Sequence, residues 1–401
     1  MSIHIDLHVL HSYPYSNLNA DAFGSPKMAI QGGVERTRIS SQCVKRGCRE
    51  AVEAVLGYRA LRTRHVPTEV ARNLTERGWE PEAAAEAAAS LMIAAGIKGL
   101  SMAESGDMTS VMLFVPDHAI NELADLAAAS PDVLRAAREA ADTDASDAPR
   151  GKGTKPKKKP VPKELKRPVA EFKAAVRTIL ASRNASIAAF GRMLTDAPDV
   201  TVSGAIAVAH SATTHAAEEQ KDYFTAVDSI HSASGAAHLG SNAHSAGTFY
   251  RYTMINVDEL CDNLNADTDT LQAILRAYLE EFANHVPGAK RNSTAPFSPP
   301  SLIYATIRTD QPVNLQGAFE APIVADDTSG WITPSIAALD EHAHAIHDYL
   351  GADDLITAVH SGTSPALDRA THLGTRIKGY KDLVDVIVTE ALNHHAKDCQ
   401  A

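Results

Sequence analysis

The chain has 401 residues, and its composition, 44% hydrophobic and 22% charged, is that of a globular protein rather than a disordered one. This length is enough for two or three folded units. The formal net charge of −11 argues against a partner that is held by bulk electrostatic attraction alone. A polyanionic partner would therefore have to be held by local basic patches.

The four cysteines show neither a Cys-x-x-Cys pair nor zinc-ligand spacing, so we expect no disulfide framework and no metal finger. The first residues lack the basic and apolar regions of a secretory leader, and no apolar run approaches the length of a membrane span. We therefore expect a soluble protein of a reducing cytoplasm.

The first predicted strand covers residues 3–10, where apolar side chains alternate with polar ones. A period of two is typical of a strand that has one covered face. The polar positions His4, Asp6 and His8 are thus expected on the open face. Residues 13–21 follow as a loop rich in Asn, Pro and Tyr.

Residues 24–55 combine flexible backbone, cations and hydroxyls: a Gly/Pro turn, the Gly32–Gly33 pair, an arginine-containing strand and a helix with Ser40 or Ser41 as N-cap. The helix has an apolar stripe formed by Val44, Gly47, Cys48, Ala51, Val52 and Val55. Its opposite face, expected to point to solvent, carries Gln42, Lys45, Arg46, Arg49 and Glu53.

Cations near a helix N-terminus are unfavourable unless an anion lies nearby, and a phosphate can supply that anion. An ordinary solvated face explains the helix alone equally well. The residues just upstream favour binding: Gly24, Lys27, Gly32, Gly33 and Arg38.

From about residue 58 to 180 the composition changes to Ala, Glu and Arg, which predicts a mostly helical insertion with helices at 116–129 and 131–142 and one short strand at 110–115. Within it, residues 151–163 contain many lysines and several prolines and cannot bury a core. This segment is either a solvated linker or an electrostatic contact to DNA or RNA phosphates.

Strand patterns return at residues 205–213, 248–257 and 302–307, and a helix pattern covers 266–284. The order strand, helix, strand, strand, helix, strand is that of the ferredoxin-like fold, which the RNA-recognition motif shares. We therefore expect an α+β fold with a large insertion after the first helix and a smaller one between the two middle strands.

The sequence contains no Walker A loop, HExxH helix, GxSxG elbow or dinucleotide-binding glycine motif, so no enzyme class is indicated. Asp21 could hold Mg²⁺ for phosphodiester cleavage, but it has no evident partner carboxylate nearby, and a lone loop aspartate is more often a turn residue. The histidines with the most suggestive spacing are His210, His215, His342, His344 and His347. Their spacing does not fit one metal site, and we assign no metal and no cofactor.

Two further stretches combine cations with apolar or hydroxyl side chains. Residues 190–194 include Arg192 and Met193, and a methionine at a loop tip can either wedge between bases or belong to the core. Residues 287–297 include Lys290 and Arg291 and are either a second phosphate contact or a plain connecting loop.

Taken together, these stretches resemble the Cas7 family, also called Cse4 or CasC, the backbone subunit of the type I-E CRISPR Cascade complex. The resemblance runs from near the N-terminus to about residue 300. It rests on residues 5–10, 16–19, 32–42 with Lys45 and Arg46, 191–193, 209–215, 223–228, 237–240, 249–252 and 286–290.

The resemblance implies a hand-like subunit with an RRM-like palm, helical fingers and a hairpin-like thumb. The palm would comprise residues 1–57, 181–213 and, with the C-terminal segment, 247–401, the fingers residues 58–180 and the thumb residues 214–246. Family members polymerise head to tail along a guide RNA. Each thumb reaches over the next copy and displaces bases at regular intervals, which leaves the other bases ready to pair with target DNA.

The resemblance also implies roles for single residues. Guide phosphates or backbone would be held by Asn19, Lys27, Ser40, Gln42, Lys45 and Arg49, and the residue patterns add Arg38, Arg46, Lys290 and Arg291. The displaced base would be stabilised by Arg192, Met193 and Leu239. Target DNA would be contacted by Lys155, Lys157, Lys158, Lys159 and Lys163.

We therefore expect a non-enzymatic, RNA-binding scaffold that orders a guide and leaves sequence recognition to base pairing. Its expected partners are a CRISPR guide RNA, target DNA, further copies of the chain and Cascade subunits of the Cas5, Cas6, Cas8 (Cse1) and Cas11 (Cse2) types. The alternative is a guide-directed RNA endonuclease like the backbone subunits of type III complexes, with Asp21 as its metal-binding residue.

Overall fold

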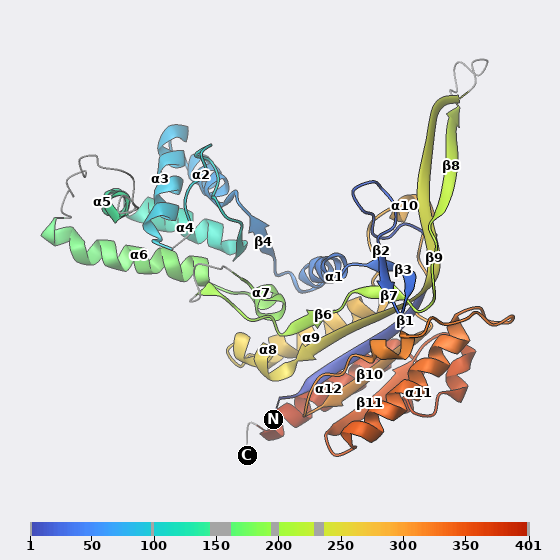
Figure 1. Ribbon diagram of the computed structural model, residues 1–401. Helices are drawn as coiled ribbons and strands as arrows, with labels where there is room; N and C mark the ends of the chain where they lie inside the picture. Colours follow the sequence, from blue (N-terminus) through green and yellow to red (C-terminus); the bar gives the residue numbers. More distant parts are fainter. Residues whose placement is uncertain (1, 98–99, 145–161, 194–199, 228–235, 399–401) are drawn as a thin grey trace, which may run out of the picture. The chain divides into compact units, whose positions relative to one another are not determined.

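A computed structural model describes residues 2–97, 100–144, 162–193, 200–227 and 236–398 (Figure 1). The chain forms two compact units. The first unit comprises Met1–Leu56 and Ala205–Ala401, and the second comprises Gly57–Gly204. None of the helices in the described ranges is both long and apolar enough to cross a membrane.

The first unit is built on an antiparallel sheet (Figure 1). Strand β1 (His4–Ser16) lies between β10 (Leu302–Arg308) and β9 (Ala236–Asn256). The short strands β6 (Ile206–Val208) and β7 (Ser211–Thr213) pair with the other edge of β9. Together with the helices that follow β1 and β9, this gives the predicted element order, and the α+β prediction is confirmed.

Helices α1 (Ser41–Leu56) and α9 (Thr268–Asn284) pack against each other. Gly47 lies at their junction, because a Cβ atom there would come within 2.2 Å of the His285 ring just beyond α9. The predicted apolar stripe of α1 is buried at Val44, Cys48 and Val52, but Val55 is exposed, so the stripe ends one turn earlier than expected.

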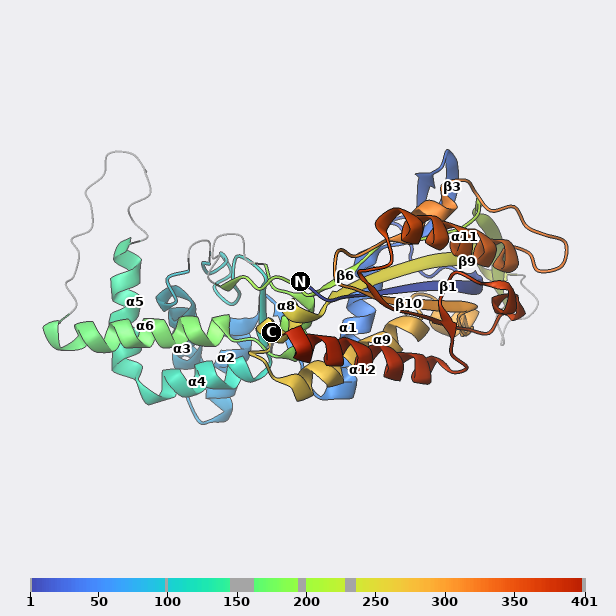
Figure 2. The same cartoon turned by 90° about the horizontal axis from the view of Figure 1, so that it is seen from below.

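The C-terminal third adds elements that lie outside the predicted ferredoxin-like order. Helix α12 (Tyr380–Asp398) packs on α9, whereas α11 (Ile332–Leu350) packs on the opposite face of the sheet (Figure 2). Strands β11 (Leu355–Ser361) and β12 (Thr375–Arg376) extend the sheet beyond β10. The short helices of the first unit are α8 (Val257–Asn263), α10 (Arg291–Thr294), η5 (Leu315–Phe319) and η6 (Pro365–Arg369).

Helix α11 is the reason why the predicted open face of β1 is wrong. His8 is buried and stacks with Tyr250, Tyr252 and Tyr304, and burial lowers its pKa to about 3. Asp6 accepts hydrogen bonds from the Tyr252 hydroxyl at 2.6 Å and from the Val313 N–H at 2.9 Å, while burial raises its pKa to about 7. Both faces of this central strand are therefore covered, and Asp6 and His8 have their partners inside the core.

A long hairpin occupies the position of the predicted thumb. Strand β8 (Gln220–Val227) pairs with the first half of β9, from Gln220 opposite His244 to Val227 opposite Ala236. Residues 228–235, between these two strands in the sequence, lie outside the described residues. Strand β9 then runs on without interruption into the middle of the sheet, so one strand forms both the hairpin and the core.

The second unit is mostly helical, as predicted. Its elements are β4 (Ala60–Thr63), α2 (Val66–Glu76), α3 (Pro81–Ala94), β5 (Leu113–Pro116), α4 (His118–Ala129), α5 (Pro131–Asp144), η2 (Lys163–Leu165), α6 (Lys166–Ala181) and α7 (Ala185–Phe190). Residues 181–204, expected in the palm, instead belong to this compact unit. Its core contains many alanines, which allow close approach of the helices.

Strands β2 (Met28–Gln31) and β3 (Val34–Ile39) form a hairpin whose two-residue turn is Gly32–Gly33. Both glycines have positive φ, as a type I′ turn requires. A Cβ atom on Gly32 would also lie 1.7 Å from the carbonyl oxygen of Glu320, whereas one on Gly33 would meet nothing within 4 Å. The turn is thus held against the segment that follows η5.

This difference between neighbouring glycines gives a testable prediction. Gly33→Ala should lower the free energy of unfolding by about 1–2 kcal/mol, because it places an alanine in left-handed backbone. Gly32→Ala should cost clearly more, because the hairpin must also move away from Glu320. Thermal unfolding of the two variants measures the difference, and equal losses would contradict the close approach.

Candidate nucleic-acid interface

Two cations face each other at the open end of the β2–β3 hairpin. Met28 pairs with Thr37, and the Arg38 N–H donates to the Lys27 carbonyl at 2.7 Å, so Lys27 and Arg38 are directly opposite. Directly opposed residues of an antiparallel pair project to the same face, where like charges repel. Within the described residues, neither side chain has an acidic partner. The pair is therefore suited to hold an anion.

The hairpin leads directly into α1, whose N-terminus is closed by three neighbouring side chains. The Asn19 amide oxygen accepts from the Ser40 N–H at 2.9 Å, and the Ser40 hydroxyl accepts from the Cys43 N–H at 3.3 Å. His210 Nδ1 accepts from the Ser41 N–H at 2.9 Å. Asn19 and Ser40, both predicted RNA contacts, thus have capping roles that fix the start of the helix.

Gln42 is the exception in this first turn. Its side chain is exposed, and in the described part of the chain its backbone N–H has no hydrogen-bond partner. A backbone N–H at a helix N-terminus is a natural donor to a phosphate oxygen. Of the predicted contacts on α1, Gln42 is therefore the one that the fold leaves ready for a ligand.

Two of the three predicted cations of α1 are less available than the sequence suggested. Lys45 is half-buried, donates to the Ile206 carbonyl at 2.8 Å and has its pKa lowered by burial. The Arg49 side chain is only 16% exposed and forms an ion pair with Glu53 at 2.7 Å. Neither residue lies on a solvent face, because the edge of the sheet covers this side of α1. Helical spacing alone did not reveal this cover.

Arg46 differs from these two. Its side chain is 76% exposed and pairs with Glu50, one turn further along the helix, at 2.8 Å. Such exposed pairs contribute little and exchange readily with other partners. Arg46 can therefore still turn to a phosphate.

The predicted loop at residues 287–297 presents a second basic surface. Lys290 has left-handed backbone and reaches toward the Asn242 side chain on β9, with an Nζ to Oδ1 distance of 3.5 Å. The Arg291 guanidinium lies 4.9 Å from the centre of the Phe297 ring, and both side chains are exposed. A cation next to an exposed aromatic ring is typical of surfaces that bind single-stranded nucleic acid.

Asp21 has a local structural role. Its Oδ1 accepts from the backbone N–H groups of Phe23 at 2.8 Å and Ser25 at 3.0 Å, which closes the loop between β1 and β2. Among the described residues, no group of three or more His, Cys, Asp or Glu side chains is arranged to hold a metal ion. The geometry thus favours the turn interpretation of Asp21 over the metal-binding one.

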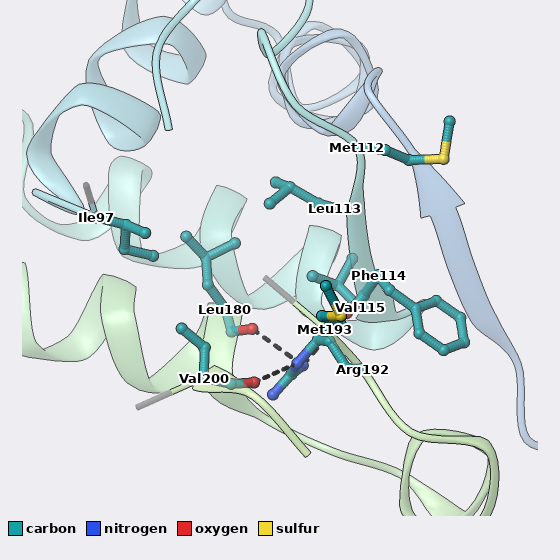
Figure 3. Close-up of a pocket in the computed structure, with 9 residues that line it drawn as sticks. All are labelled: Ile97, Met112, Leu113, Phe114, Val115, Leu180, Arg192, Met193 and Val200. Carbon is teal, nitrogen blue, oxygen red and sulfur yellow. Dashed lines mark hydrogen bonds between the residues drawn. The ribbon is translucent and has the colours of Figure 1, made fainter. Parts of the chain in front are cut away.

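Arg192 is buried in the second unit, contrary to its predicted place at the RNA (Figure 3). Its guanidinium donates to five carbonyl oxygens, those of Phe114, Leu180, Ala181, Ser182 and Val200. These bonds join the end of α6 to β5 and to residue 200, so the side chain is buried among backbone carbonyls and does not face a solvent surface where RNA could bind. The sequence pattern at residues 190–194, a cation among apolar residues, does not tell whether the arginine is buried or exposed.

Met193 next to it is 81% exposed and borders a small apolar pocket, lined also by Ile97, Met112 and Leu113 (Figure 3). Leu239 is in the first unit, 53% exposed on β9 opposite Thr225. Both side chains are thus accessible to a base, as their predicted role requires. Lys155, Lys157, Lys158 and Lys159 lie outside the described residues, and Lys163 is the first residue of η2.

The buried guanidinium gives a prediction for stability. Arg192→Ala should lower the free energy of unfolding of the second unit by about 3 kcal/mol or more, because several buried carbonyls lose a charged donor. Arg62→Ala on β4 is the matched control: its side chain is exposed, and its loss should cost less than about 0.5 kcal/mol. Thermal unfolding tests both, and an equal effect would contradict the structural role of Arg192.

Comparison with known proteins gives two kinds of match. The family model described as CT1975-like protein matches residues 5–385. A solved structure named "CRISPR RNA-guided surveillance complex, pre-nicking" contains a chain that is 34% identical, with a TM-score of 0.79, over 97% of this chain and 100% of that chain. A chain of another, named "CRISPR RNA-guided surveillance complex", is 31% identical, with a TM-score of 0.71, over 96% and 99%. A search of curated proteins gives no match.

Proposed function

This chain belongs to the CT1975-like family, and on that premise we propose how it acts as a guide-RNA-binding, Cas7-type subunit of a CRISPR surveillance complex. The observation that carries the mechanism is the pairing of Lys27 with Arg38 at the start of α1. A phosphate placed between these side chains relieves their mutual repulsion and accepts hydrogen bonds from both. The backbone N–H of Gln42 is then the nearest helix donor for the same phosphate or its neighbour.

The basic loop at residues 287–297 holds a second part of the RNA. Arg291 and Phe297 offer a cation and an aromatic face to an unpaired base. Lys290 places its ammonium group, on a flexible side chain, next to the adjoining phosphate. Contacts of this kind read shape and charge rather than base identity. The bases therefore remain available for pairing, which is what an RNA-guided complex needs.

The finer assignments are part of the proposal. The chain serves a type I-E complex in the cytoplasm, works without catalysis, and assembles head to tail with copies of itself along the guide. Its further partners are target DNA and subunits of the Cas5, Cas6, Cas8 and Cas11 types. The resemblance described above supports these assignments, and the local role of Asp21 gives no support to the endonuclease alternative.

The mechanism is tested with the double variant Lys27→Ala/Arg38→Ala. It should bind a fluorescein-labelled, unstructured single-stranded RNA at least tenfold more weakly, and the slope of log affinity against log salt should fall by about 0.7 for each lost phosphate contact. Fluorescence anisotropy at several salt concentrations measures both quantities.

The control carries the same charge change at another place in the first unit. Lys378→Ala/Lys381→Ala removes two exposed lysines near the start of α12 and should leave affinity and salt slope within about twofold of the unmodified chain, because it removes no phosphate contact. If both double variants weaken binding equally, the Lys27 and Arg38 assignment is wrong. If the unmodified chain retains no RNA, the function itself is wrong.

A further inference from the structure

We propose that His210 is a positioning residue of the guide-RNA site, which holds the Arg38 guanidinium over the first turn of α1. The inference rests on the proposed function and extends it to a residue outside the basic cluster. His210 Nδ1 lies 3.2 Å from Arg38 Nη1 and 2.9 Å from the Ser41 backbone nitrogen. One ring nitrogen thus joins the cation to the helix N-terminus.

The chemistry of the two neighbours fixes the state of the ring. A backbone N–H and a guanidinium can only donate, so Nδ1 must carry a lone pair, and the proton of the neutral ring must be on Nε2. Burial, and then the charge of Arg38, lower the pKa of His210 and keep the ring neutral at neutral pH. A protonated ring would lose both hydrogen bonds.

The backbone brings the three residues together. Arg38 on β3 is paired with Ala212 on β7, two residues beyond His210. Strands β6 and β7, which both pair with β9, are separated by residues 209 and 210, and this interruption turns His210 out of the ladder toward α1. The placement is therefore fixed by the sheet rather than by a surface loop.

Arg38 needs such support because, in the described part of the chain, its guanidinium has no ion pair and no other side-chain hydrogen bond, and Lys27 opposite repels it. An arginine that is already ordered loses less conformational freedom when a phosphate binds. His210 therefore raises RNA affinity without touching the RNA.

Substitutions that replace one ring nitrogen at a time give a sharp test. The side-chain oxygen of asparagine lies close to the position of Nδ1, whereas that of glutamine reaches the position of Nε2. His210→Asn should therefore bind the labelled single-stranded RNA within twofold of the unmodified chain. His210→Ala and His210→Gln should bind three- to tenfold more weakly, with a lower salt slope.

A double-mutant cycle shows whether the effect passes through Arg38. If it does, His210→Ala/Arg38→Ala should bind no more than twofold more weakly than Arg38→Ala alone. Circular dichroism and thermal unfolding check that each variant is folded. If the alanine variant unfolds, the contrast between asparagine and glutamine decides the question by itself.

Several results would overturn the inference. These are unchanged or tighter binding by His210→Ala and His210→Gln, equal binding by the asparagine and glutamine variants, or additive effects in the cycle. Tighter binding would mean that the ring occupies donors that the phosphate itself uses. If Lys27→Ala/Arg38→Ala weakens binding while the histidine variants do not, this inference fails and the proposed function stands. If neither set weakens binding, the RNA mechanism fails as well.

Discussion

The antiparallel pairing of β1 with β9 is the interaction on which the rest of the first unit depends. It runs from His4 opposite Asn256 to Ser16 opposite Ser245, and these two strands form the centre from which the sheet extends on both sides, through β10 next to β1 and through β6 and β7 next to β9. Because β9 continues into the hairpin with β8, the hairpin and the centre of the sheet share one continuous strand.

On a chain with a net charge of −11, the position of each cation matters more than the number of cations. Arg49 and Lys45 are bound by groups of their own chain, and Arg192 is committed to five carbonyls. Lys27 and Arg38 lack acidic partners in the described residues and sit where a helix begins. Local geometry thus separates cations that stabilise the protein from cations that can bind.

Much of the fold could be predicted because strand and helix periodicities report directly on burial. The ferredoxin-like order and the helical second unit follow from such local patterns. Burial by distant segments left no such signal: α11 covers His8 and Asp6, and the carbonyls around Arg192 belong to the backbone. The role of His210 depends on a two-residue break between strands, which the continuous pattern at 205–213 concealed.

The opposed charges of Lys27 and Arg38 also have a meaning for the protein without RNA. Electrostatic repulsion between these two side chains destabilises the protomer without RNA, whereas a bound phosphate removes this repulsion. Any ligand that binds only the folded state adds its binding free energy to the stability of that state. The RNA is then in part a structural component of the β2–β3 hairpin. Protomers without RNA would be less stable than RNA-bound ones, and would therefore have the shorter lifetime in the cell.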